Sequence, residues 1–325
     1  MINQSFEQNI INSKSFVELI NKCETKDESG LNDFQKLPVE DLISIPRVGI
    51  NRFRMPIKIK SKLNEISSHD ATASMYVSLN AKKNGISMSR LCSILQTEAE
   101  HYPLDVHFFK KVLARYIDEL SDEGDETPIT NTWLKISFNY GLKQKSLKSD
   151  NWGWQYYPVT FTGKYSLEKG FQFFMSLEYE YSSTCPCSLS MAKQYEREFA
   201  QGLTTEGVGI GVAHGQRSSL QTTIELDLNK ELAIEDYVLL LRAAIPTETQ
   251  SLVKRVDEQA FAILNGAYPI FVEHAAKEIY KTLNSQKFIL DWIASIQHFE
   301  SLHSHNAVAV IYKGISGGLN NDQVF

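Results

Sequence analysis

The 325-residue sequence predicts an α+β protein, in which an antiparallel sheet carries helices packed on one face. Two observations lead to this fold class. Long segments rich in aromatic and β-branched residues alternate between apolar and polar positions, which is typical of half-buried strands. The predicted helices are grouped after strands instead of alternating regularly with them, which disfavours a doubly wound parallel sheet.

The first predicted unit covers residues 46–130 and combines two strands with two helices. Its elements, in chain order, are strands over 48–59 and 71–79 and helices over 86–96 and 105–120. The two strands could pair as a hairpin. The preceding residues 1–45 are rich in Asn, Ser, Glu, Asp and Lys, so we expect a polar N-terminal extension with little core of its own.

The second predicted unit covers residues 131–325 and repeats the order of strands followed by helices. Its predicted strands are 133–142, 157–165, 170–181, 219–228, 289–299 and 307–312. Its predicted helices are 189–200, 234–244 and 271–283. The segment 143–153 is rich in Lys, Ser and Asn, so we expect an exposed hairpin loop between the first two of these strands.

Composition and charge exclude several classes of function. The net charge of −6 argues against a general affinity for nucleic acid or for anionic membranes. Residues 1–16 lack the apolar run of a secretory signal or a transmembrane helix, so the cytoplasm is the expected location. Four cysteines are too few for a disulfide scaffold, which favours a reduced compartment with functional thiols.

Cysteine and histidine residues gather in three short motifs that indicate a catalytic metal site. The motifs are Cys-Pro-Cys-Ser at 185–188, His-Gly-Gln-Arg-Ser at 214–218 and Glu-Ser-Leu-His-Ser-His at 300–305. Thiolate and imidazole are preferred ligands of a borderline transition metal, and a carboxylate with an open position is typical of a catalytic site. Cys185 follows a predicted strand and precedes a helix, whose N-terminus favours the thiolate. Taken alone, the cysteine pair could equally be two buried small hydrophobic residues.

Two other patterns leave their function open. His303 and His305 are separated by one residue, so an extended backbone would point them the same way, as a metal site or as a solvent-facing pair. The glycine run 207–211 lacks the strand, spacing and helix of a dinucleotide-binding loop. We expect a flexible loop that delivers His214 to the site.

With these residues in view, the sequence resembles the type IB GTP cyclohydrolases, which adopt the tunneling fold. The resemblance covers most of the chain beyond residue 45. It rests on seven motifs in the expected order, at 48–50, 85–90, 157–163, 185–188, 213–218, 252–258 and 299–305. It implies two tandem tunneling-fold units, the second carrying the metal site, and a homo-oligomeric barrel, most readily a homotetramer with active sites at the subunit interfaces. An open antiparallel sheet also leaves edge strands that assembly would cover.

The resemblance implies one divalent metal ion per subunit, which could be manganese, iron or zinc. The implied ligands are Cys185, His214, Glu258 and His303, with Cys187 and His305 as reserves. Cys185 and His214 are also the implied catalytic residues. His214 could exchange on and off the metal to shuttle protons, or could stay fixed as a ligand.

The resemblance also implies residues that bind the substrate. Glu273 corresponds to the carboxylate that anchors guanine, although a solvated helix carboxylate is the simpler explanation of that residue. Arg217 is expected to contact the triphosphate, together with Lys254 and Arg255, because guanidinium groups bind phosphate oxygens in a fork. Structural ion pairs would explain these cations equally well.

The implied activity is a hydrolase reaction on a cyclic amidine. GTP and water would give 7,8-dihydroneopterin triphosphate and formate, the first step of folate and pterin biosynthesis. Two alternatives remain: another tunneling-fold enzyme acting on a pterin or deazapurine, and a non-catalytic metal-binding protein. The chain departs from the family pattern at Ser87, at Gly215 and in a long, partly helical insertion between Cys185 and His214.

Overall fold

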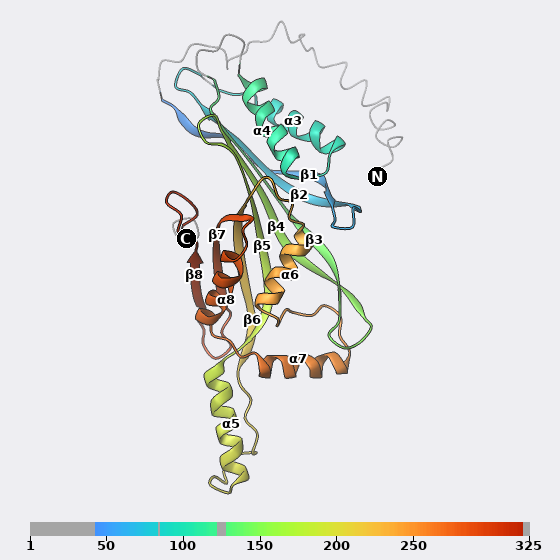
Figure 1. Ribbon diagram of the computed structural model, residues 1–325, viewed down its shortest axis with the longest axis vertical. Helices are drawn as coiled ribbons and strands as arrows, with labels where there is room; N and C mark the ends of the chain where they lie inside the picture. Colours follow the sequence, from blue (N-terminus) through green and yellow to red (C-terminus); the bar gives the residue numbers. More distant parts are fainter. Residues whose placement is uncertain (1–42, 84, 122–127, 321–325) are drawn as a thin grey trace, which may run out of the picture.

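The computed structural model describes residues 43–83, 85–121 and 128–320 (Figure 1). The predicted extension 1–45 lies outside the described residues except for its last three. Eight strands form a single antiparallel sheet whose spatial order follows the chain from β1 to β8. The strands are β1 (Ile45–Lys60), β2 (Ile66–Leu79), β3 (Asn131–Lys145), β4 (Trp152–Ser166), β5 (Gly170–Thr184), β6 (Gly215–Leu226), β7 (Ile289–His298) and β8 (Ala307–Tyr312).

The helices fall into two groups by their place on the sheet. They are α3 (Met88–His101), α4 (Val106–Leu120), α5 (Pro186–Ala200), α6 (Ile234–Ala244), α7 (Arg255–Ala267) and α8 (Val272–Asn284). α3, α4, α6 and α8 contribute side chains to one apolar core with the sheet. α5 projects from one end of the sheet and α7 crosses that same end (Figure 1).

Alternating burial explains why the helices cover one face of the sheet. In β2, Ala71, Ala73, Met75 and Val77 are buried, while the residues between them are partly exposed. Successive side chains of a strand point to opposite faces, so one face of the sheet is apolar and the other largely polar. The predicted α+β architecture, a sheet with helices packed on one face, is therefore confirmed, although α5 and α7 lie outside that layer.

The element order repeats across the sheet. Two strands, two helices and two strands run from β1 to β4, and the same order runs from β5 to β8 with α5 and α7 as additions. The sheet is continuous across the predicted boundary at residue 130, because residues 71–77 of β2 pair with residues 132–138 of β3. α7 was not predicted. Within the described residues, no helix is both long and apolar enough to cross a membrane.

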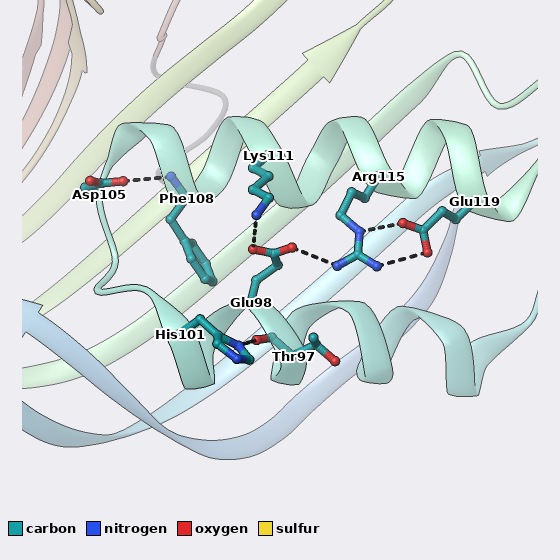
Figure 2. Close-up of polar contacts among 8 residues, drawn as sticks. All are labelled: Thr97, Glu98, His101, Asp105, Phe108, Lys111, Arg115 and Glu119. Carbon is teal, nitrogen blue, oxygen red and sulfur yellow. Dashed lines mark hydrogen bonds and ion pairs between the residues drawn. The ribbon is translucent and has the colours of Figure 1, made fainter.

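A glycine and a buried carboxylate set the packing of α3 and α4. A Cβ atom at Gly163 would lie 2.9 Å from atoms of Phe109 and Leu113, so glycine lets α4 approach β4 closely. Glu98 on α3 is 5% exposed and forms ion pairs with Lys111 and Arg115 on α4, each at 2.8 Å (Figure 2). Burial alone would raise the pKa of Glu98, but these two cations hold it below its ordinary value.

The sheet divides near the end of β5. β4 pairs with β5 only over residues 159–166, so residues 152–158 pair with β3 alone. A segment after α6 bonds to the edge of β5 that β4 leaves unpaired. Ser182 N donates to Thr247 O at 2.8 Å, and Thr249 N donates to Glu180 O at 3.2 Å. This division opens the end of β5 to α7 and to the loops around it.

The predicted exposed loop 143–153 needs a correction. β3 continues to Lys145 and β4 starts at Trp152, so the connection is only residues 146–151. Ser146 and Ser149 in it are buried, because Ser146 Oγ donates to Leu252 O and Ser149 Oγ donates to Asp257. The connection therefore packs Ser146 and Ser149 against the start of α7, while Leu147, Lys148 and Asp150 are exposed as predicted.

Candidate active site

The end of the sheet brings Cys185 and His214 together. Cys185 directly follows β5 and His214 directly precedes β6. Cys185 N donates to His214 O at 3.2 Å, which continues the pairing of the two strands beyond Thr184 and Gly215. Strand pairing therefore places these two predicted ligands side by side, despite the insertion between them.

The inserted segment folds as a projecting arm. Pro186 occupies the first turn of α5, where its missing N–H costs nothing, and Cys185 is the N-cap residue with a partly buried thiol. This confirms the predicted helix and the predicted place of Cys185 at its N-terminus. The glycine run is a loop that returns along α5, where Gly209 N donates to the hydroxyl of Tyr195 at 3.2 Å.

Hydrogen bonds orient the His214 ring. Its Nδ1 lies 3.1 Å from Gln216 Oε1 and 3.7 Å from Glu300 Oε2. Gln216 Nε2 donates to Ser183 Oγ at 2.9 Å and lies 3.4 Å from Glu300 Oε1, which turns the amide oxygen toward the ring. Two oxygen acceptors therefore face Nδ1, an arrangement that suits the tautomer with its proton on Nδ1 and leaves Nε2 as the nitrogen available to a ligand.

Glu258 and Arg217 line one groove beside this pair. The groove has a volume of about 390 Å³. Its lining residues are Glu180, Arg217, Thr249, Gln250, Val253, Glu258 and Phe261. The side chain of Arg217 is 73% exposed and pairs with Glu180 at 3.2 Å. Lys254 and Arg255 are exposed at the start of α7, close in sequence to Glu258.

His303 and His305 lie in an exposed loop between β7 and β8. Their rings stack with centroids 4.8 Å apart and an interplanar angle of 11°. The side chains lie side by side as the one-residue spacing predicts, although the backbone there is a loop and not a strand. Glu300 at the start of the same loop is the residue that faces His214.

Glu273 is exposed in the first turn of α8, near the end of β7. Its neighbour His298 is 2% exposed and shares a hydrogen bond with the Tyr181 hydroxyl at 2.8 Å. Burial lowers the pKa of His298 to about 4, while the negative charge of Glu273 acts in the opposite direction. His298 is therefore neutral at pH 7, and it is a core histidine.

The single chain forms only part of the predicted metal site. In the part of the chain that the structure describes, no three His, Cys, Asp or Glu side chains lie close enough to hold a metal ion. Cys185 and His214 are adjacent, whereas neither Glu258 nor His303 completes a three-ligand group with them. The donor types fit a borderline divalent metal, since they are a thiolate, imidazoles and a carboxylate. The four-ligand set stays a prediction.

Three residues of the site were not assigned a role from the sequence. Gln216 follows His214 by two positions, a spacing that places both on one face of an extended chain. Glu300 belongs to the motif that supplies His303. Asp257 precedes Glu258 and occupies the third position of α7, where acidic residues cap helices. Each of these three residues lies in a sequence motif in which a neighbouring residue was assigned the functional role instead.

Comparison with known proteins identifies the family of the chain. Residues 31–309 match the family described as type I GTP cyclohydrolase folE2. The chain is 36% identical to GTP cyclohydrolase FolE2 of Cereibacter sphaeroides, over 88% of this chain and 76% of that protein. It is 39% identical to the FolE2 of Dinoroseobacter shibae, over 83% and 70% of the two chains. The FolE2 of Hydrogenovibrio crunogenus is 33% identical, over 86% and 92%.

Among solved structures, the chain is similar to uricase from Arthrobacter globiformis. The TM-score is 0.46 at 9% identity, covering 85% of this chain and 95% of the uricase. So distant a likeness adds nothing about the reaction. Family membership is shown by the match over residues 31–309 and by the relatives at 33–39% identity. This chain belongs to the family of type I GTP cyclohydrolases of the folE2 kind.

Proposed function

We propose that the protein is a metal-dependent GTP cyclohydrolase, which hydrolyses GTP to 7,8-dihydroneopterin triphosphate and formate. Membership of the family supports this activity. The observation that carries it is the adjacency of Cys185 and His214, which strand pairing produces across a long insertion. A cytoplasmic location and the use of the product in folate biosynthesis are parts of the proposal.

The proposed metal site consists of Cys185, His214, Glu258 and His303, and would take manganese, iron or zinc. When bound, the ion supplies Lewis-acid chemistry that lowers the pKa of a water molecule to about 7. The protein's own residues prepare this site. Cys185 is held at the N-terminus of α5, and Gln216 with Glu300 orients the ring of His214 through Nδ1.

Glu273 is the proposed anchor for the guanine base. A carboxylate can accept from the ring N–H and the exocyclic amino group of guanine together, which fixes the base in one orientation. Arg217 is the proposed contact for the triphosphate, because its guanidinium is exposed in the groove and, among the described residues, pairs with Glu180 alone. Phosphate oxygens could replace that carboxylate. Lys254 and Arg255 would add positive charge nearby.

The proposed active enzyme is a homo-oligomer, most readily a tetramer. β1 and β8 each have a strand neighbour on one side only in the described chain, so both edges are available for pairing with another copy. The separation of Glu258 and His303 from the Cys185 and His214 pair is consistent with a pocket that a second subunit completes.

A metal add-back experiment tests the proposed function. Protein stripped of metal is given manganese, iron or zinc separately, and formate and the fluorescence of the oxidised pterin are followed with GTP present. We expect both products with at least one metal. Metal binding without either product would favour a non-catalytic metal protein or an enzyme with another substrate.

A Glu273→Gln variant separates binding of the metal from turnover. As the base anchor, Glu273 is needed for the reaction and not for the metal, so the variant should bind metal like the unaltered protein and release no formate. Retained turnover would remove Glu273 from the site.

A further inference from the structure

Asp257 is buried at the point where α7 meets the rest of the protein. It is 0% exposed, and it is the only buried residue of α7, all of which the structure describes. Helices usually take their position from a buried apolar face. α7 has no such face, so its position depends on polar contacts at its two ends.

Four hydrogen bonds hold the Asp257 carboxylate. Oδ1 accepts from Lys148 N at 2.7 Å and from Ser149 N at 2.8 Å. Oδ2 accepts from Ser149 Oγ at 2.6 Å and from Lys254 N at 2.8 Å. Burial alone would raise the pKa of Asp257, but these bonds hold it well below its ordinary range, so the carboxylate is ionised at pH 7.

These bonds tie α7 to the connection between β3 and β4. Lys148 and Ser149 belong to that connection, while Lys254 is the N-cap residue of α7. At the other end of α7, Ser182 Oγ on β5 donates to Asn265 Oδ1 at 2.7 Å. Asp257 therefore fixes the end of the helix that carries Glu258, and Asn265 fixes the far end.

We propose that Asp257 is the positioning residue that holds Glu258 at the groove it shares with Arg217. The two acidic residues are successive positions of a helix, so they point in directions about 100° apart. Asp257 points into the protein and Glu258 into the groove. The inference rests on the proposed role of Glu258 as a metal ligand.

The test measures the affinity of metal-free protein for Zn²⁺ or Mn²⁺ by titration calorimetry, without any assay of turnover. Asp257→Asn keeps the shape of the side chain but replaces one acceptor oxygen by a donor. We expect metal affinity to fall about 10-fold, the lower end of what outer-shell partners of a metal site contribute. Circular dichroism at the titration temperature confirms that the variant is folded.

Asp291→Asn is the matched control for a purely structural effect. Asp291 is 1% exposed and accepts from the backbone N–H groups of Trp292 at 2.8 Å and Leu319 at 2.7 Å. It lies near the start of β7, away from the end that carries His298. We expect this variant to melt at a lower temperature with unchanged metal affinity.

A double-mutant cycle tests whether Asp257 acts through Glu258. If it does, Asp257→Asn combined with Glu258→Gln binds metal as weakly as Glu258→Gln alone. Additive losses would overturn the inference, and so would unchanged affinity in Asp257→Asn. If Asp257→Asn does not fold, Ser149→Ala removes a single bond to the carboxylate and should weaken metal binding a few-fold; unchanged affinity there would again overturn the inference.

The failure of the inference and the failure of the proposed function give different results. Weaker metal binding in Glu258→Gln with unchanged binding in Asp257→Asn would overturn the positioning role alone. Unchanged binding in Glu258→Gln would remove Glu258 from the metal site and overturn the positioning role with it, whereas the proposed function fails only if metal-loaded protein releases no formate from GTP.

Discussion

Helices α4 and α7 are of similar length but are held in opposite ways. α4 buries seven side chains against the sheet, which are Phe108, Phe109, Val112, Leu113, Tyr116, Ile117 and Leu120. α7 buries Asp257 alone. The helix layer over the first half therefore supplies stability, whereas α7 contributes little to the core and carries Glu258, the carboxylate proposed as a metal ligand. Substitutions in the two regions should therefore change different quantities.

The largest effect on stability is expected from Phe109→Ala. Phe109 is 0% exposed, and its ring lies 5.1 Å from the ring of Phe173 between centroids. Truncation of such a residue costs about 3–5 kcal/mol in the free energy of unfolding. Urea unfolding measures this loss. Metal affinity of the folded fraction should stay unchanged, and a parallel loss of metal affinity would break the comparison between the two regions.

Cys185→Ser is expected to weaken metal binding with little change in stability. Loss of a direct ligand should weaken metal binding by more than the ~100-fold that an outer partner can contribute, while the free energy of unfolding of metal-free protein changes little, because the thiol is only partly buried. Titration calorimetry measures the affinity. Cys187→Ser is the control, since Cys187 is exposed, and it should bind metal normally. The opposite result for the two cysteines would exchange their roles.

A smaller effect on metal binding is expected from Gln216→Leu. The change removes the amide oxygen that faces His214 Nδ1, so the ring is less firmly held with Nε2 free, and affinity should fall about 10-fold. Gln221→Leu on the same strand is the control, because Gln221 is exposed and contacts Glu178 at 3.4 Å. Equal losses in both variants would show that the strand and not the His214 contact matters.

The smallest effect concerns the buried Glu98 (Figure 2). Its pKa in the folded protein lies below its ordinary value of 4.5, so the folded state binds fewer protons than the unfolded state as pH falls below that value. The contribution is present above pH 4.5 and is lost as pH falls through the lowered pKa. Its size is no more than about 1 kcal/mol, because the partner Lys111 is half-exposed.

Urea unfolding of Glu98→Gln and of the unaltered protein checks this sign. The difference between their free energies of unfolding should be largest near pH 7 and shrink below pH 4.5. A difference that grows on acidification would contradict the lowered pKa.

The strength of the apolar pattern explains which parts of the fold could be predicted from the sequence. Apolar periodicity is strong in the strands and in α4, so those elements were predicted, with ends that differ by a few residues. α7 was missed although Val256, Ala260 and Ile263 have helical spacing, and in the structure Val256 and Ile263 are exposed instead of joining the core. The connection 146–151 was predicted to be exposed, as Leu147, Lys148 and Asp150 are, but its Ser and Lys composition gives no sign that Asp257 and Leu252 bury its two serines.

The candidate site was predicted from motifs more than from physics. Periodicity could not bring Cys185 next to His214, because their contact depends on the pairing of β5 with β6 across an inserted arm. The role of Gln216 depends on which way its amide points, and this is set by Ser183 on β5 and by Glu300 in the loop after β7. Such long-range contacts leave no local pattern in the sequence.

The most direct test of the central claim uses GTP labelled with ¹³C at C8 of the guanine ring. With metal-loaded protein, we predict that the label appears as ¹³C-formate in NMR spectra, in a one-to-one ratio with the dihydropterin, and that Cys185→Ser releases neither. Label that remains in the purine or pterin, or formate release that survives loss of Cys185, would contradict the account.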